Sequence, residues 1–367
     1  MKKIVLTGGG TAGHVTPNIA LLPALREAGY EVLYIGSYEG MERKLIEATG
    51  TPYRGISSGK LRRYFDWKNF TDPFRVLKGY GEAKAILRDF RPDLIFSKGG
   101  YVAVPVVRAA KRLGIPAVIH ESDMTPGLAN RLSYSAATKI CCNFPETLSL
   151  LPKDKAVLTG SPIRAELLSG NRETALALTG FSDSRPVLLV IGGSLGSRAV
   201  NAAVRDALPD LLKDFQVLHI AGKNNLDPAL SDTPGYRQFE YVSEELKDYF
   251  ALADIMVSRA GANAICEILA LRKPNVLIPL SAKASRGDQI LNARSYEKQG
   301  YSRVLEEEAL SRDTLLAAVR ETYADRARYL AAMEAGGSAN GVAQVMSVIE
   351  SVAAAPREKK SVTAGRR

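Results

Sequence analysis

The feature that most constrains this chain is a repeated pattern in which a short apolar strand runs into a glycine-rich loop and then into a helical segment. Both halves of the chain open this way, at Val5–Gly10 and at Leu189–Ser194. Short apolar strands that alternate with amphipathic helical stretches are typical of parallel sheets covered by helices. We therefore predict an α/β protein with two Rossmann-like, doubly wound domains facing across a cleft, and ligands at the carboxyl ends of the strands.

The apolar runs predict strands in each half of the chain. In the first half they lie at 3–6, 31–35, 94–96, 117–120 and 139–142, and in the second at 186–191, 217–220, 238–241, 255–258 and 275–279. Amphipathic stretches at 81–89, 102–113 and 342–352 predict helices, and the last of these could pack against either domain. We expect an N-terminal domain at 1–162, a C-terminal domain at 163–340, a helix at 341–355 and a basic, disordered tail at 356–367.

Length and composition exclude several classes of protein. The 367 residues favour two domains of the usual ~150 residues. The apolar and charged fractions, 46% and 24%, are those of a soluble globular protein. No apolar stretch approaches the ~18 residues of a membrane span, and the apolar start is too short for a signal peptide, so we expect a cytoplasmic protein. The three cysteines and three histidines lack metal-site spacing, which predicts neither a disulfide framework nor a zinc site.

The formal net charge of +10 is concentrated in two segments. One is the tail after Pro356, and the other is the block 60–88, with eight Lys and Arg against three acidic residues. This block interleaves basic and aromatic side chains, beginning with Arg62, Arg63, Phe65, Trp67 and Phe70. A membrane contact needs aromatic rings that insert at the headgroup boundary and cations that bind anionic lipid, and this block offers both. The block could instead be a loop whose rings fold inward, or a stacking surface for single-stranded nucleic acid; we expect no nucleic-acid partner.

Glycine loops recur along the chain. Gly8–Gly13 fits G-x-G-x-x-G between a strand and a helix, where the backbone can approach a phosphate. A nicotinamide-binding domain also needs an acidic residue at the end of the second strand, and Tyr34–Ser37 has none. Similar loops lie at 97–101, 192–197 and 258–263. Their distribution over both halves indicates a polyanionic or polyhydroxylated ligand, and a nucleotide sugar offers both chemistries.

A few side chains beside these loops could carry chemistry. His14 begins the helix after the first loop, where the helix N-terminus favours a neutral imidazole that can act as a general base; it could instead cap the helix or contact a phosphate. We predict that His120 is a structural residue whose hydrogen bonds are satisfied within the protein, and that His219 is a core residue. Arg164, at the domain junction, could fork onto a diphosphate or be an ordinary surface arginine. Glu267 could accept hydrogen bonds from ribose hydroxyls.

Taken in order, these segments resemble the MurG family of peptidoglycan glycosyltransferases. The matching segments are Gly8–His14, Lys98–Tyr101, His120–Glu121, Gly160–Arg164, Gly192–Gly196 and Arg259–Ala262 with Glu267. The resemblance implies a GT-B fold and inverting transfer of N-acetylglucosamine from UDP-N-acetylglucosamine to the muramoyl 4-hydroxyl of lipid I, giving lipid II. It implies no cofactor and no metal. It also implies a peripheral position on the cytoplasmic face of the membrane, with anionic lipids and other cell-wall synthesis enzymes as partners.

The resemblance also implies a role for each matched position, with His14 as the candidate base. Arg164 and Ser194 would hold the diphosphate, Glu267 the ribose hydroxyls and Gln289 the N-acetylglucosamine. The remaining donor positions would be Thr11, Ala12, Gly13, Asp123 and, at a main-chain contact with uracil, Val242. The acceptor and membrane positions would be Lys98, Gly99, Gly100, Tyr101, Phe65, Trp67, Phe70, Arg62 and Arg63.

One position departs from the family pattern. After His120–Glu121 the family commonly has an asparagine that contacts the sugar, and this chain has Asp123, which accepts hydrogen bonds but cannot donate as an amide does. A related transferase that uses a different lipid-linked acceptor is therefore a second hypothesis. A third is a UDP-N-acetylglucosamine 2-epimerase, which needs no lipid acceptor, and a fourth is a nucleotide-sugar-sensing or membrane-binding module without activity.

Overall fold

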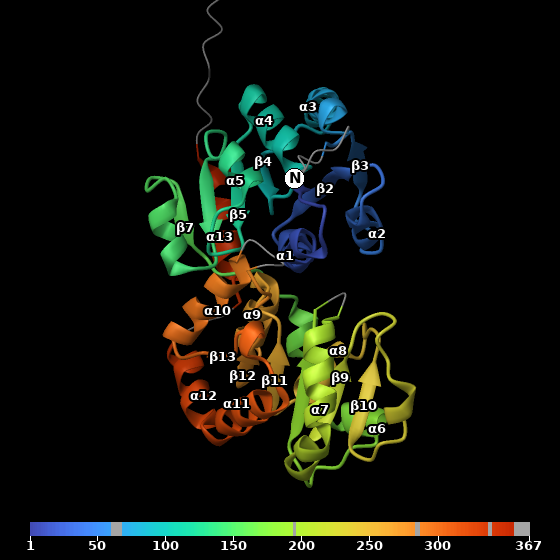
Figure 1. The fold of residues 1–367 in the computed structure, drawn as a ribbon. Helices are drawn as coiled ribbons and strands as arrows, with labels where there is room; N and C mark the ends of the chain where they lie inside the picture. The colour runs from blue at the N-terminus through green and yellow to red at the C-terminus, as the bar shows by residue number, and fades with distance from the viewer. Residues whose placement is uncertain (60–67, 194–195, 283–286, 337–339, 356–367) are drawn as a thin grey trace, which may run out of the picture. The chain divides into compact units, whose positions relative to one another are not determined.

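The computed structural model describes residues 1–59, 68–193, 196–282, 287–336 and 340–355. Within these ranges the chain forms two compact units. The first unit contains residues 1–122, 126–162 and the C-terminal helix that starts at residue 342, and the second contains residues 123–125 and 163–341. Each unit is a parallel sheet with helices on both faces (Figure 1), so the predicted α/β class with two Rossmann-like sheets is confirmed.

Among the described residues, the first sheet has seven parallel strands in the order β3-β2-β1-β4-β5-β6-β7. The strands are β1 (Lys2–Thr7), β2 (Tyr30–Ser37), β3 (Tyr53–Ile56), β4 (Leu94–Ser97), β5 (Ala117–Glu121), β6 (Lys139–Cys142) and β7 (Ala156–Leu158). The helices of this unit are η1 (Ala12–His14), α1 (Thr16–Glu27), α2 (Met41–Glu47), α3 (Lys68–Phe90), α4 (Ala103–Leu113), α5 (Leu128–Ser133), η2 (Pro145–Leu150) and α13 (Val342–Ala354).

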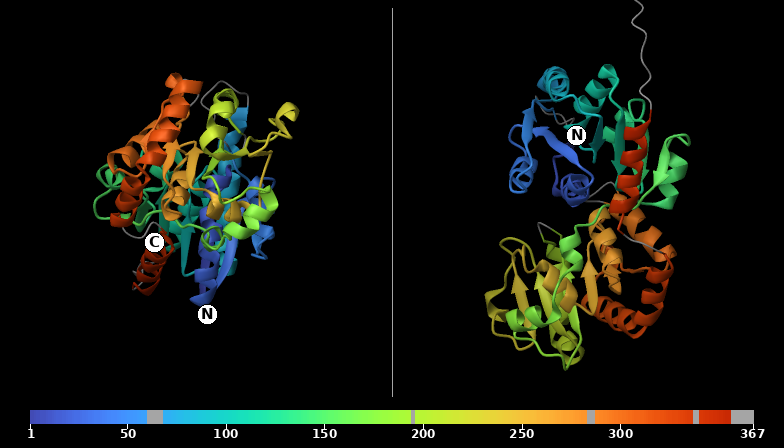
Figure 2. Two further views of the ribbon diagram at one scale, coloured as in Figure 1. Left: turned by 90° about the horizontal axis from the view of Figure 1, so that it is seen from below. Right: turned by 180° about the vertical axis from the view of Figure 1, so that it is seen from behind.

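Strand β1 shows how the sequence builds this unit. Its side chains alternate between the two faces, so that Ile4 and Leu6 join one buried cluster and Val5 joins the other. Helices α1 and α13 cover the face of Ile4, and helices α3 and α4 cover the face of Val5. Helix α13, drawn in red in Figure 2, thus packs on the first unit. The sequence alone did not determine which of the two domains this helix packs against.

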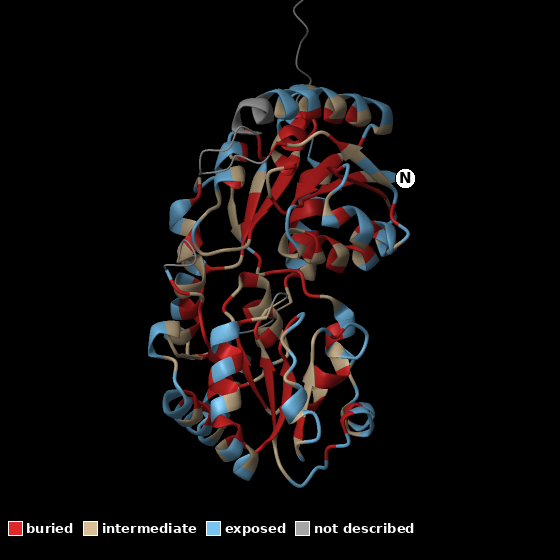
Figure 3. Cartoon of the chain, turned by 45° about the vertical axis from the view of Figure 1, so that its right-hand side comes forward, coloured by how far each residue is buried: buried red, intermediate tan, exposed pale blue. Residues whose placement is uncertain are grey.

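The second sheet has six parallel strands within the described ranges, in the order β10-β9-β8-β11-β12-β13. They are β8 (Val187–Ile191), β9 (Gln216–Ile220), β10 (Tyr236–Phe239), β11 (Ile255–Ser258), β12 (Asn275–Leu277) and β13 (Arg303–Val304). The helices are η3 (Ala165–Leu168), α6 (Arg172–Thr179), α7 (Arg198–Asp214), η4 (Pro228–Leu230), α8 (Leu246–Leu252), α9 (Ala262–Ala270), α10 (Asp288–Lys298), η5 (Glu307–Ala309), α11 (Arg312–Ala324) and α12 (Arg326–Ala335). Figure 3 shows the buried central strands of both sheets in red.

The strand order places the glycine loops. In each sheet the chain first builds strands outward to one edge and then returns to the centre, so that β4 pairs with β1 in the first unit and β11 pairs with β8 in the second. The switch in strand order lies between these two central strands. The loops at 8–10 and 98–101 follow β1 and β4, and those at 192–193 and 259–261 follow β8 and β11. Each unit therefore brings two glycine loops to the carboxyl edge at its topological switch point, where open parallel sheets bind ligands.

The strands predicted from the sequence are confirmed, with ends within two residues of the observed ones. The poorest match is β10, which covers Tyr236–Phe239, so that both ends of the prediction for 238–241 were displaced by two residues toward the following loop. Strands β3, β7 and β13 were not predicted at all. In the described part of the chain, no helix is both long enough and apolar enough to cross a bilayer.

Candidate active site

The two glycine loops of the first unit pack directly on each other. Gly10 has a φ of 88° and Gly100 a φ of 83°, backbone conformations that favour glycine. A Cβ on Gly10 would lie 2.6 Å from Cε1 of Tyr101, and a Cβ on Gly100 would lie 2.2 Å from the carbonyl oxygen of Gly9. Side chains at either position would force the loops apart. The close contact of the loops thus depends on glycine at both positions.

His14 lies at the end of η1, just before α1. Its Nδ1 is 3.0 Å from the hydroxyl oxygen of Thr11. Burial and, second to it, the nearby charge of Lys98 lower the pKa of His14 to about 4, while a hydrogen bond to the Gly9 backbone and the charge of Glu42 act in the opposite direction. The imidazole is therefore neutral at pH 7 and can accept a proton.

Lys98 is a buried cation, with 1% of its surface exposed. Its Nζ lies 2.8 Å from Nδ1 of His120 and 2.7 Å from Oγ of Ser122. An ammonium can only donate, so Nδ1 of His120 accepts and Nε2 carries the hydrogen that the carbonyl of Gly160 accepts at 2.9 Å. Burial lowers the pKa of His120 well below its usual value. The prediction that His120 is a satisfied structural residue is confirmed.

Two residues of this site escaped the sequence analysis. Glu42 is fully buried, and its carboxylate accepts hydrogen bonds from the backbone N–H and hydroxyl of Ser37 and from the N–H of Gly10. Asn18, also buried, donates to the carbonyl of His14. Neither residue belongs to a known pattern, and the only signal for Glu42 is the cluster of glycines around it at positions 9, 36 and 40.

In the second unit, Arg164 and Glu267 face each other. Their closest charged atoms are 3.9 Å apart, and both side chains are partly buried. Burial raises the pKa of Glu267, and the charge of Arg164 opposes that rise. The arrangement presents a guanidinium and a carboxylate side by side, which suits a ligand with both an anionic part and hydroxyl groups.

Arg259 organises the loops at the carboxyl edge of the second sheet. Its guanidinium donates to Oγ of Ser197, which caps helix α7, and to the carbonyls of Ile278 and Pro279 after β12. It also pairs with Glu307. Arg259 therefore holds the loop after β12 against the start of α7, and we assign it a structural role.

The remaining donor positions of the second unit are placed as follows. Val242 is buried, and the side-chain carbonyl of Gln289 accepts the N–H of Leu280 at 3.0 Å. The carboxylate of Asp123 accepts a hydrogen bond from Nδ2 of Asn292 at 3.1 Å. Ser194 lies outside the described residues.

The basic-aromatic block is described only in part. Arg62, Arg63, Phe65 and Trp67 lie outside the described residues, and Phe70 lies in helix α3. Further along the same helix, Phe74 and Leu77 are 74% and 67% exposed. Tyr80, in contrast, packs against the buried cluster beneath α3. The hypothesis of inward-folded rings therefore describes Tyr80 but not Phe74. His219, as predicted, is a core residue, bonded to Tyr236 and Asn201.

Two doubly wound parallel sheets, each with paired glycine loops at its switch point, define a two-domain protein of the GT-B class. The sequence comparisons define the family. The model of the glycosyltransferase family 28 N-terminal domain matches residues 4–142, and that of the family 28 C-terminal domain matches residues 187–349. The chain belongs to glycosyltransferase family 28.

Among curated relatives, a Lachnospira eligens protein is 63% identical over 350 residues, which cover 95% of this chain and 99% of the relative. It is named UDP-N-acetylglucosamine--N-acetylmuramyl-(pentapeptide) pyrophosphoryl-undecaprenol N-acetylglucosamine transferase. Among solved structures, Acinetobacter baumannii MurG matches with a TM-score of 0.74 and 24% identity, over 96% of this chain and 100% of that one. A putative UDP-N-acetylglucosamine 2-epimerase from Listeria monocytogenes matches with a TM-score of 0.68 and 10% identity, over 96% of each chain. The two structural matches show the fold alone.

Proposed function

We propose that this chain transfers N-acetylglucosamine from UDP-N-acetylglucosamine to the muramoyl 4-hydroxyl of lipid I, the undecaprenyl-diphospho-muramoyl-pentapeptide, and so forms lipid II. The observation that carries the proposal is the 63% identity, over nearly the whole of both chains, to a relative whose name states that transfer. The neutral imidazole of His14 beside the paired glycine loops supports it, because the reaction needs a base at the acceptor hydroxyl.

The reaction is a single displacement with inversion. The acceptor oxygen attacks the anomeric carbon of N-acetylglucosamine, the bond from that carbon to the diphosphate oxygen breaks, and UDP leaves. An imidazole nitrogen of His14 takes the hydroxyl proton as the new bond forms. One base is sufficient, since no covalent intermediate has to be hydrolysed.

The second unit would bind the donor. Arg164 meets the negative charge that develops on the departing diphosphate, together with the backbone N–H groups of the glycine loop after β8 and Ser194. Glu267, adjacent to Arg164, accepts hydrogen bonds from the ribose hydroxyls. Gln289 would contact the N-acetylglucosamine, Val242 the uracil, and Thr11, Ala12 and Gly13 the donor from the first unit.

Asp123 also has a role in this proposal. Its carboxylate is already bonded to Asn292 of helix α10, the helix that carries Gln289. A carboxylate held in this way can accept a hydrogen bond from a sugar hydroxyl. The amide of Asn292 is buried and already donates to Asp123 and to the carbonyl of Ala260, so Asp123 would keep only the accepting role of the amide that the family pattern has after His120–Glu121.

The exposed side chains of Phe74 and Leu77 support a contact with a lipid surface, on the cytoplasmic face of the membrane where the acceptor is anchored. Gly99, Gly100 and Tyr101 would face the acceptor, and Lys98, which is buried against His120 and Ser122, would act beneath them. Substituting Phe74 and Leu77 with serine should reduce binding to vesicles that contain anionic lipid. The rate with a water-soluble acceptor should stay unchanged.

The function is tested with labelled UDP-N-acetylglucosamine and a panel of lipid-linked acceptors, with and without anionic vesicles. Product should form only with the muramoyl-pentapeptide acceptor, and His14→Ala should lower kcat by about 10²- to 10⁴-fold while UDP still binds. Product from the donor alone would identify an epimerase. Full turnover by His14→Ala with weaker donor binding would make His14 a ligand and not the base.

A further inference from the structure

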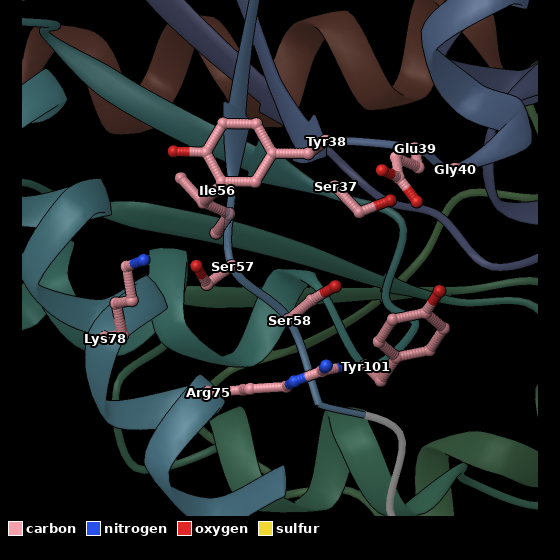
Figure 4. A pocket seen from close by; sticks show the side chains of 10 residues that line it. All are labelled: Ser37, Tyr38, Glu39, Gly40, Ile56, Ser57, Ser58, Arg75, Lys78 and Tyr101. Atoms are coloured by element: carbon pink, nitrogen blue, oxygen red, sulfur yellow. The ribbon is translucent and has the colours of Figure 1, made fainter. Parts of the chain in front are cut away.

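The first unit contains a cavity of about 480 Å³ beside the loops of the site described above. It lies beyond the carboxyl ends of β2 and β3, and helix α3 and the loop after β4 form its other walls. The volume is in the range of small-molecule sites. Figure 4 shows its lining residues, among them Tyr101, whose ring also contacts Gly10 in the loop that leads to His14.

The lining is rich in hydrogen-bond donors and positive charge. Arg75 and Lys78 enter from helix α3, one turn apart, and three serines, Ser37, Ser57 and Ser58, enter from the strand ends. In Figure 4 the guanidinium of Arg75 extends toward Ser58 and the ammonium of Lys78 points toward Ser57. Arginine, lysine and serine hydroxyls together are the side chains that bind phosphate oxygens.

Two carboxylates lie near the two cations of the cavity, so the formal charges balance, but the cations differ in how closely they are paired. Among the described residues, Lys78 has one acidic neighbour, Glu82, at 3.9 Å, and that carboxylate already accepts hydrogen bonds from the N–H and hydroxyl of Ser57. Glu39 also lines the cavity, next to Gly40 and on the side away from Lys78 in Figure 4. Arg75 is exposed and available to a ligand.

The surroundings of the cavity indicate which phosphate it binds. Phe74 and Leu77, the exposed apolar side chains of α3, alternate along the helix with Arg75 and Lys78. If they meet a lipid surface, the cavity lies at the depth of the lipid headgroups. A phosphate there can belong to a lipid-linked substrate, and the sugar attached to it would extend along Tyr101 toward the loop of His14.

We propose that this cavity binds the diphosphate of the lipid-linked acceptor, with Arg75 and Lys78 as its cationic ligands. The inference rests on the proposed function and adds to it the site that holds the acceptor. Arg75 forks onto phosphate oxygens, Lys78 adds a second charge, and Ser58 adds a hydroxyl donor. The hydroxyls of Ser37 and Ser57 already donate to Glu42 and Glu82. Glu39 opposes binding, since its carboxylate repels the diphosphate.

The kinetic test uses the full chain, in detergent, with two water-soluble acceptors that carry the same muramoyl pentapeptide. One is joined to a short prenyl chain through a diphosphate, and the other through an uncharged linker. Arg75→Ala should lower kcat/KM by about 10- to 100-fold for the diphosphate acceptor only. Arg75→Lys should recover part of that loss, and Glu39→Gln should raise kcat/KM. The matched control is Arg88→Ala, an exposed arginine of the same helix that does not line the cavity.

Three outcomes would overturn the inference. An equal loss with both acceptors would mean that Arg75 acts on the sugar, the peptide or the fold. No loss with either acceptor, together with unchanged binding to phosphatidylglycerol vesicles, would mean that the cavity is not used. Loss of binding to phosphatidylglycerol vesicles, with unchanged kinetics on the soluble diphosphate acceptor, would assign the cavity to membrane headgroups.

A binding measurement separates this inference from the proposed function, because it needs no turnover. The affinity for a short prenyl diphosphate is measured with the donor site saturated by UDP. Binding that depends on Arg75, in a protein that transfers sugar to no acceptor, would refute the function and keep the cavity. Normal transfer with binding that is independent of Arg75 would refute the cavity and keep the function.

Discussion

The pH dependence of transfer should respond in opposite directions to the removal of two buried charges beside His14. Lys98 lowers the pKa of His14 and Glu42 raises it. Lys98→Met removes the cation at similar side-chain length, and Glu42→Gln removes the anion with little change of shape. If His14 is the base, the acidic limb of kcat/KM reports its pKa in the free enzyme.

The expected size of the shift follows from the causes of the pKa. In the unmodified chain the pKa of His14 is about 4, below the ordinary value of 6.5, so kcat/KM should be flat at neutral pH and fall about tenfold per pH unit below 4. Burial lowers the pKa more than Lys98 does, and it remains after Lys98→Met. The limb should therefore move upward from 4 without reaching 6.5, and Glu42→Gln should move it below 4.

Both substitutions disturb hydrogen bonds, so the fold has to be checked. Lys98→Met leaves Nδ1 of His120 without its donor, a loss of about 1–3 kcal/mol in the free energy of unfolding. Glu42→Gln can place an amide donor against the N–H of Gly10. Thermal unfolding at each pH identifies the range in which kinetics describe folded protein.

The assay combines rates with a direct titration. The chain has three histidines, so the imidazole signals of His14, His120 and His219 can be assigned by substitution and followed by NMR. In each variant, the pKa of His14 measured by NMR and the pKa of the acidic limb of kcat/KM should shift by the same amount. A limb near 6.5 in the unmodified chain, or shifts of the same sign in both variants, would refute the assignment of His14 as a base tuned by these charges.

Three further predictions concern different parts of the molecule. Glu267→Gln should raise the KM for UDP-N-acetylglucosamine about tenfold with a smaller change in kcat, measured by initial rates. Burial lowers the pKa of His219 to about 3, below its ordinary value of 6.5. Its contribution to stability is therefore present above pH 6.5 and falls by about 1.4 kcal/mol per pH unit toward pH 3, in addition to the contributions of His14 and His120. His219→Leu should remove this share of the slope in urea unfolding but lower stability at pH 7, since Tyr236 and Asn201 lose their hydrogen bonds to the imidazole. Gly100→Ala should abolish transfer but weaken UDP binding, measured by calorimetry, much less, since most of the proposed donor contacts lie in the second unit.

The strands that the sequence predicted poorly share one property. Strands β3, β7, β10 and β13 are the edge strands of the two sheets, and each pairs with a single neighbour. A central parallel strand is buried on both faces and reads as a continuous apolar run, as at 187–191. An edge strand such as Tyr53–Ile56, with Arg54 and Gly55, has no such run. Its position is decided by pairing with β2, which the local sequence does not record.

The same limit applies to the site. Glycine loops and His14 could be found because their chemistry depends on residue type and local spacing. Glu42 could not, because in Met41–Glu47 it has the appearance of an ordinary helical surface acid. Its function comes from full burial and from three hydrogen bonds to positions 10 and 37. Lys98 was found, but as an acceptor contact, and its bond to His120 depends on the pairing of β4 with β5.

The first glycine loop also has a second explanation. The sequence assigns its glycines to the approach of a phosphate, yet a Cβ on Gly9 would lie 2.7 Å from Cδ of Glu42, and a Cβ on Gly8 would lie 2.5 Å from the carbonyl oxygen of His14. The space that side chains would need is filled by the buried carboxylate that tunes His14 and by the backbone of His14 itself. Glycine here thus allows a buried anion and the turn that carries the base to pack against the loop. A phosphate need not touch this loop for its glycines to be required, which agrees with a separate cavity for the acceptor diphosphate.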